Sequence, residues 1–339
     1  MAGNPTQEAP MKKLATLLLG LLSLVVASAA AFAVWIQLSW DRDHDAQPTP
    51  RLAASQDPEV IKQGEYVVRA LAHCSDCHSP AGAEGHAPDQ APRMIGGRVF
   101  DVPVFGKFIA PNITPDAETG LGSWTDDEIA RVLRNGVSRD GHMRPFMAII
   151  APMADEDLIA VLSYLRTLPA AKGVTVDDQP TLIGKFLIKG MEPERRAAPP
   201  YVAAGGISVE RGRYLALGPA NCAGCHSASS PQSGLLPEQP YLAGPLEPVP
   251  DETDANMEFA PPNLTPDAET GHLYHWDEDA FVARFKAGRV FKGSHMPWEA
   301  FGKMTEADLR SIYRFLRSLP PAHRQTGPTR RPRGYAQPS

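Results

Sequence analysis

Cysteine is scarce in this chain: the sequence of 339 residues contains four, Cys74, Cys77, Cys222 and Cys225. All four lie in two Cys-x-x-Cys-His units, "CSDCH" and "CAGCH", so none remains for a structural disulfide. The sequence also lacks runs in which apolar and polar residues alternate, which predicts little β-sheet. Its net charge of −6 argues against a general nucleic-acid binder.

Proline, in contrast, is abundant: the chain has 34 prolines, about twice the average usage. Because X-Pro pairs favour extended or turn geometry, we expect short helices joined by long loops. Together with the absence of strand-like runs, this composition predicts an all-α fold. Residues 322–339 are rich in arginine, proline and glycine, and this basic tail is predicted to be disordered.

The two Cys-x-x-Cys-His units decide between three kinds of site. A thioredoxin-like redox pair needs a surrounding βαβ pattern, which is not visible. A zinc ribbon separates its two cysteine pairs by roughly 15–20 residues, far less than the separation of Cys77 from Cys222. The histidine directly after each pair is typical of c-type haem attachment. Residues three apart lie on one face of a helical turn, so both sulfurs can bond one porphyrin, with His78 or His226 as the axial ligand.

The chain repeats itself, and each haem motif opens one repeat. "GEYVVRALAHCSDCH" matches "GRYLALGPANCAGCH", "PNITPDAETG" matches "PNLTPDAETG", and "DLIAVLSYLRTLP" matches "DLRSIYRFLRSLP". The repeats define two domains of one architecture, 57–170 and 206–321, separated by a linker, 171–205. Each domain has a helix before the haem motif, a second helix that opens with a capping box (Thr125 and Glu128 in the first domain), and a third that ends before proline.

At these motifs the resemblance to a known family is clear. Each half resembles a class I cytochrome c domain, and the chain resembles the membrane-anchored di-haem cytochromes c of bacteria. The resemblance implies two tandem all-α domains, each with one covalently bound haem c, attached through Cys74 and Cys77 or through Cys222 and Cys225. It also implies that the first and last helices of each domain cross at a small residue. The crossing pairs are Gly64 with Tyr164 and Gly212 with Phe315.

The two halves differ in the residues that could supply the second axial ligand of each iron. The resemblance implies a methionine there, and "GSHMPW" supplies Met296 in the second half. The first half reads "DGHMRPFM" and offers two candidates. The internal repeat pairs Met143 with Met296, whereas the family pattern, with "PFM" ahead of an acidic helix start, favours Met147, which we take as the ligand. Bis-histidine ligation through His142 or His295 is the alternative.

The twin "NxTPDxETG" segments contain spaced acids, but a calcium site needs more oxygen ligands than this spacing offers. We interpret them as turn-forming loops in which Asn112 and Asn263 bond local backbone.

Residues 14–36 carry no charge and follow Lys12 and Lys13. This length can span a bilayer, and the lysines place residues 1–13 in the cytoplasm. A cleaved signal peptide is the alternative, because "ASA" at 27–29 resembles a cleavage site. Residues 37–56 are predicted to be a flexible tether. Either arrangement puts the haem domains outside the inner membrane, in the periplasm. We predict the uncleaved anchor, which makes the chain a single-pass membrane protein.

The predicted function is electron transfer between redox protein partners, either alone or as the cytochrome subunit of a larger dehydrogenase or oxidase. The sequence has no evident catalytic acid–base pair, nucleophile or second cofactor motif, so we expect no enzyme activity. The alternative is a haem enzyme with one open iron, such as a di-haem peroxidase or a thiosulfate-oxidising cytochrome.

Overall fold

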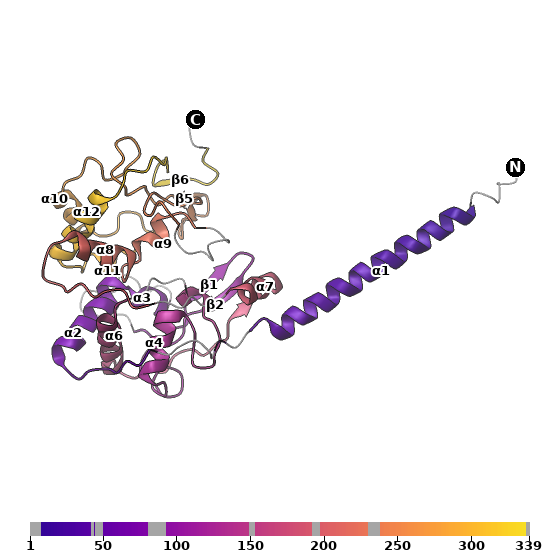
Figure 1. The fold of residues 1–339 in the computed structure, drawn as a ribbon, viewed down its shortest axis with the longest axis horizontal. Coiled ribbons are helices and arrows are strands. Elements are labelled where there is room, and N and C mark those ends of the chain that lie inside the picture. Colours follow the sequence, from indigo (N-terminus) through magenta and orange to yellow (C-terminus); the bar gives the residue numbers. More distant parts are fainter. Residues whose placement is uncertain are drawn as a thin grey trace.

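One long helix stands apart from the rest of the molecule. The computed structural model describes residues 8–41, 44, 50–80, 93–148, 153–191, 197–229 and 238–336. Most of helix α1 (Glu8–Ser39) projects away from the body of the molecule, and its last turns contact the helix of residues 182–190 (Figure 1). Its stretch Lys13–Ser39 is long and apolar enough to cross a membrane. The apolar helix predicted over 14–36 is therefore present as a candidate anchor, while residues 1–7 lie outside the described part of the chain.

The two repeats fold into the same order of helices. In the first half these are α2 (Pro58–Tyr66), the π-helix η1 (Val67–Leu71), α3 (Cys74–His78), α4 (Asp126–Asn135), α5 (Pro145–Ala148) and α6 (Asp155–Thr167). In the second half they are α8 (Val209–Leu217), α9 (Cys222–His226), α10 (Glu278–Lys286), α11 (Trp298–Phe301) and α12 (Glu306–Ser318). One further helix, α7 (Leu182–Gly190), lies between the halves in sequence. The helix-rich architecture expected from the sequence is present.

Local sequence explains where these helices begin and cross. The predicted capping box is present at α4: Thr125 accepts from the Glu128 N–H, and the Glu128 carboxylate accepts from the Thr125 N–H. A Cβ added to Gly64 would lie 1.9 Å from a backbone oxygen of α6 and 2.8 Å from the Cβ of Tyr164. A Cβ on Gly212 would meet α12 equally closely, 2.8 Å from the Cβ of Phe315. Both predicted crossings are thus confirmed, and only glycine fits at them.

The prediction of an all-α fold is wrong in part, because the described residues contain two three-stranded antiparallel sheets. The first has the order β1 (Val99–Val102), β2 (Gly106–Ile109) and β3 (Gln179–Pro180). The second has the order β4 (Val249–Pro250), β5 (Met257–Phe259) and β6 (Arg330–Pro332). Strands of two to four residues are too short to show an alternating pattern, which explains why the sequence does not reveal them.

Three segments expected to be linkers or disordered are built into the fold. In the tail expected to be disordered over 322–339, residues 322–336 are described and include β6, where Arg331 Nε lies 2.7 Å from the buried Glu258 carboxylate. The linker 171–205 supplies β3 and α7. In the tether 37–56, the N–H groups of Leu52 and Ala54 donate to aspartates at the start of α4, at 2.9 and 2.7 Å. The composition of these segments indicated a polar, mobile chain. In the fold, however, backbone N–H groups of the tether bond to the start of a helix, and a charged side chain of the tail bonds to a buried carboxylate.

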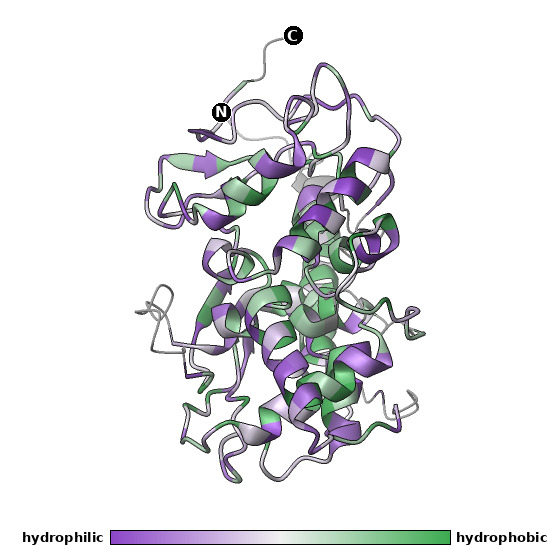
Figure 2. Ribbon diagram, turned by 90° about the vertical axis from the view of Figure 1, so that its left-hand side faces the viewer, coloured by the Kyte–Doolittle hydropathy of each residue, from purple (hydrophilic) through white to green (hydrophobic). Residues whose placement is uncertain are grey.

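The two halves pack against each other through one continuous core. Its buried side chains come from both repeats and include Val67, Leu158 and Met153 from the first, and Leu215 and Phe301 from the second. Figure 2 shows hydrophobic residues along the helices in the middle of the molecule. The halves are therefore joined by shared apolar burial as well as by the connecting chain.

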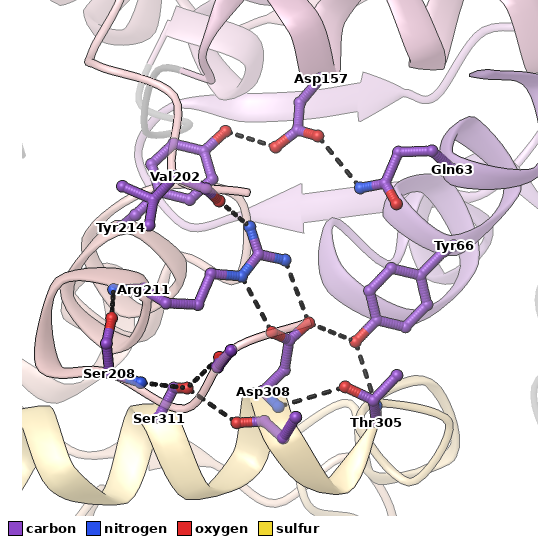
Figure 3. Close-up of polar contacts among 12 residues, drawn as sticks. Gln63, Tyr66, Asp157, Val202, Ser208, Arg211, Tyr214, Thr305, Asp308 and Ser311 are labelled. Carbon is purple, nitrogen blue, oxygen red and sulfur yellow. Dashed lines mark hydrogen bonds and ion pairs between the residues drawn. The ribbon is translucent and has the colours of Figure 1, made fainter. Parts of the chain in front are cut away.

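Two tyrosines cross between the halves in matching geometry (Figure 3). The Tyr66 hydroxyl donates to the Asp308 carboxylate at 2.7 Å, and the Tyr214 hydroxyl donates to the Asp157 carboxylate at 2.5 Å. Each hydroxyl also accepts a backbone N–H at 3.1 Å, from Thr305 and Ala154 respectively. Burial, together with the neighbouring carboxylate, raises the pKa of both tyrosines, so each remains a hydroxyl donor. Since the repeat pairs Tyr66 with Tyr214 and Asp157 with Asp308, the two contacts are copies of one another.

Beside these tyrosines the two halves differ in one residue pair. Arg211 donates to both oxygens of Asp308, at 2.9 and 3.1 Å, and both side chains are 1 % exposed. The repeat places Gln63 where Arg211 stands, and its amide donates to Asp157 at 3.2 Å. One buried carboxylate therefore has a cation as its partner, and the other has a neutral amide.

Candidate functional site

Both Cys-x-x-Cys-His units form a single helical turn, α3 in the first half and α9 in the second. The residue before each turn adopts the left-handed backbone conformation, with φ of 39° at His73 and 45° at Asn221. The first cysteine of each pair is half-buried and the second is exposed. Each unit therefore forms a helical turn, as expected from its spacing.

The first thiol of each pair packs against the main core cluster. Burial raises the pKa of both Cys74 and Cys222 to about 12. A redox-active or metal-binding cysteine needs a thiolate, which a lowered pKa provides. Among the described residues, no three histidine, cysteine or acidic side chains are grouped as a metal site would require. The thioether interpretation agrees with these surroundings.

Each motif histidine is buried and fixed by one hydrogen bond. His78 Nδ1 lies 2.8 Å from the carbonyl oxygen of Pro111, and His226 Nδ1 lies 3.0 Å from that of Pro262. Because a carbonyl can only accept, Nδ1 carries the proton and Nε2 keeps its lone pair for a metal. Burial lowers the pKa of both histidines, which favours the neutral imidazole. Both rings are held in the tautomer that an axial iron ligand requires.

The carbonyls that hold the histidines come from the "NxTPDxETG" loops. Asn112 accepts from the Thr114 N–H at 2.9 Å and donates to the Ala171 carbonyl at 2.8 Å. Asn263 makes the same two contacts, at 3.0 Å with Thr265 and 2.8 Å with Ala322. The predicted turn-forming role of both asparagines is confirmed. The sequence analysis missed the proline carbonyl, although a proline directly before each asparagine is repeated in both halves.

The methionine candidates lie in corresponding loops. Met296 is half-buried, packs against the main core cluster and precedes α11 by two residues. Met143 precedes α5 by two residues, is buried and forms a β-bridge with Val137. Met147 is half-buried within α5. Met143 and Met296 each precede a short helix by two residues, which favours Met143 as the counterpart of Met296. In burial, however, Met143 differs from the other two, because it is buried whereas Met147 and Met296 are half-buried.

The histidines of the bis-histidine alternative have other partners. His295 Nε2 lies 2.7 Å from the Pro250 carbonyl, and its Nδ1 lies 3.5 Å from Glu252. His142 Nδ1 lies 2.8 Å from the Asp41 carboxylate. The contacts of His295 involve both ring nitrogens and favour a structural role for that ring over axial ligation, whereas the contact of His142 involves Nδ1 alone and does not decide its role.

The residues at both sites fit a covalently attached haem. Each offers two thiols on one turn and a neutral imidazole with Nε2 free for iron. A methionine, the candidate for the remaining axial position, is present in the matching loop of each half.

Comparison with known proteins agrees with this chemistry. Residues 59–165 match the family described as cytochrome C oxidase, cbb3-type, subunit III. The chain is 27 % identical to a "Diheme cytochrome c-type" protein of Cereibacter sphaeroides, over 89 % of this chain and 97 % of that protein. It is 29 % identical to the gluconate 2-dehydrogenase cytochrome c subunit of Pantoea cypripedii, over 77 % of this chain. It is 30 % identical to the fructose dehydrogenase cytochrome subunit of Gluconobacter japonicus, over 84 %.

The lengths of these proteins differ. The match covers 59 % of the gluconate 2-dehydrogenase subunit and 57 % of the fructose dehydrogenase subunit. The chain therefore spans about three fifths of these two relatives, and nearly all of the di-haem protein.

Proposed function

We propose that this chain is a c-type cytochrome that transfers electrons through covalently bound haem c, and that it consists of two tandem class I cytochrome c domains, 57–170 and 206–321. The observation that carries this proposal is the repeated histidine geometry, in which a proline carbonyl fixes Nδ1 in both halves. When bound, a c-type haem supplies an iron that takes up and releases one electron. The chain's own contribution is to orient each imidazole and to bury it.

We assign the ligands residue by residue. Cys74 and Cys77 hold one haem and Cys222 and Cys225 the other, through thioether bonds. His78 and His226 are the first axial ligands. The second axial ligands are Met296 and, in the first half, Met147, with Met143 as the alternative. The partial burial that Met147 shares with Met296 supports this choice, because Met143 is already covered by protein and tied to Val137.

The partner follows from the relatives and the anchor. We propose that the chain is the cytochrome subunit of a membrane-bound dehydrogenase, with both haem domains on the periplasmic side. The named relatives serve dehydrogenases of gluconate and fructose, and Lys12 and Lys13 precede the apolar helix. In membranes that contain the chain, such substrates should reduce its haems. If no substrate of this class does so while a chemical reductant does, the partner assignment is wrong.

The ligand assignment is tested by substitution. Intact mass should first show two haem additions, one of which is lost in Cys222→Ala/Cys225→Ala. Methionine ligation to ferric haem gives a weak near-infrared absorption band, so the oxidised protein should show intensity for two such centres. Met296→Ala should remove one centre and Met147→Ala the other, while Met143→Ala, the matched control, leaves both.

Three outcomes would contradict these assignments. A band lost in Met143→Ala but not in Met147→Ala would reverse the choice in the first half. Intensity for one centre only, with ready binding of cyanide or peroxide at the other, would indicate an enzyme with one open iron. A mass equal to the bare polypeptide would contradict covalent haem.

A further inference from the structure

Helix α7 lies in the segment that joins the two halves and contacts the end of α1 (Figure 1). The rings of Phe186 and Phe32 are 5.8 Å apart. Lys185 Nζ donates to Gln37 Oε1 at 2.8 Å, and Lys189 Nζ lies 4.9 Å from the Trp35 ring centre. Ile36, between these α1 residues, is fully buried. The last turns of α1 are therefore fixed to α7.

The three sides of α7 differ in character. Gly184 and Ile188 are buried, and a Cβ on Gly184 would lie 2.0 Å from the Phe105 carbonyl oxygen, so this side sits directly on the β1–β2 turn. The two lysines face α1. The third side is apolar and exposed, and consists of Leu182, Ile183 and Phe186. We name these three residues the α7 apolar face.

The exposed apolar surface continues beyond α7. Val104, whose carbonyl accepts from the Thr181 hydroxyl at the start of α7, is 57 % exposed. On the α1 side, Trp35 is 51 % and Leu38 is 81 % exposed. The α7 apolar face is therefore continuous in the fold with the end of the candidate membrane span. Lys185 also lies 5.4 Å from the Trp40 ring, which places both lysines beside tryptophans.

Tryptophan and lysine at the end of an apolar helix are typical of the membrane–water interface. A short helix with an exposed apolar side and lysines beside it is suited to lie in that interface, with the apolar side among acyl chains and the ammonium groups near phosphates. A protein partner would also cover apolar side chains. Continuity with α1 and the lysine–tryptophan pairs favour lipid.

We propose that α7 is an interfacial helix that lies in the outer leaflet beside α1, with the α7 apolar face buried in lipid and Lys185 and Lys189 at the level of anionic headgroups. This rests on the proposed role of α1 as a membrane span. The contact of α7 with lipid is a second attachment to the membrane besides α1. It fixes the first half at the bilayer surface, so that α1 is an anchor with a defined orientation. The same burial explains why three large apolar side chains are exposed on one helix.

The test uses the full chain in cell membranes, with a benzophenone amino acid introduced at one position at a time. Ile183, which is 58 % exposed, reports on the α7 apolar face. Leu21, in the middle of α1, is the positive control for lipid. Val290, which is 65 % exposed and follows α10 in the second half, is the matched negative control. After irradiation, peptide mass spectrometry distinguishes phospholipid adducts from protein adducts.

We expect phospholipid adducts at Ile183 and Leu21 and none at Val290. A lipid adduct at Leu21 with none at Ile183 would overturn the interfacial helix and leave the anchor intact. A protein adduct at Ile183 with lipid at Leu21 would show that a partner subunit covers this face, and would also overturn it. No lipid adduct at either position would instead contradict the membrane span on which the inference rests.

Discussion

Replacing Arg211 tests what the charge difference at the interface contributes to stability. Arg211→Leu removes two hydrogen bonds to Asp308. The Asp308 carboxylate, which is 1 % exposed, is then left without its cation. Breaking a buried ion pair by removing one partner costs about 3–5 kcal/mol of unfolding free energy. Gln63→Leu is the matched control, because it removes one amide hydrogen bond of 3.2 Å from the equivalent carboxylate. That loss is about 1.5 kcal/mol.

The assay is denaturation of the full chain in mild detergent, followed by circular dichroism. At about 2–4 °C per kcal/mol, Arg211→Leu should lower Tm by roughly 6 °C or more, and Gln63→Leu by clearly less. Arg211→Leu/Asp308→Asn should recover much of the loss, because it removes the uncompensated charge while the asparagine can still accept from Tyr66. Equal losses in the two single variants, or no recovery in the double variant, would refute the argument.

Two further predictions concern the contacts that hold the helices together. Gly64→Ala should lower the unfolding free energy by at least about 1–3 kcal/mol, because its Cβ would meet backbone atoms of α6. Gly190→Ala, whose Cβ would have nothing within 4 Å, is the control and should be neutral. Urea denaturation of both variants measures this, and equal unfolding free energies would contradict the prediction. Tyr66→Phe and Tyr214→Phe should each cost about 1.5–3 kcal/mol by losing a hydrogen bond to a carboxylate; thermal denaturation would show matching losses, and a neutral result in either would contradict the shared geometry.

Local chemistry made the haem motifs and helix crossings predictable. Covalent attachment requires two thiols and an imidazole at fixed spacing, so a short segment contains the whole signal. The capping box at Thr125 is equally local. The crossing at Gly64 was accessible through the repeat and the family resemblance, because only glycine allows α2 and α6 to approach so closely.

Contacts between distant segments were not predictable. The strands have two to four residues, and β2 and β5 each pair with a strand from a segment that composition assigns to linker or tail, β3 and β6 respectively. The crossed tyrosines join residues more than two hundred positions apart in one case, and no periodicity marks such a pair. The only sequence signal was the repetition of Tyr66 and Asp157 in the second half. The choice between Met143 and Met147 also depends on side-chain direction, which spacing does not determine.

The crossed tyrosine contacts have the form of an isologous interface, in which residue i of one subunit meets residue j of the other and the reverse also holds. The two halves of this single chain therefore relate to one another as the subunits of a homodimer do. In a true homodimer every substitution appears twice, so an arginine beside one aspartate would also stand beside the other. Because the halves are fused in one chain, the two equivalent positions can hold different residues, Arg211 beside Asp308 and Gln63 beside Asp157. Two redox centres in identical surroundings would share an electron equally, and a joined chain is free to place different charges in its two halves.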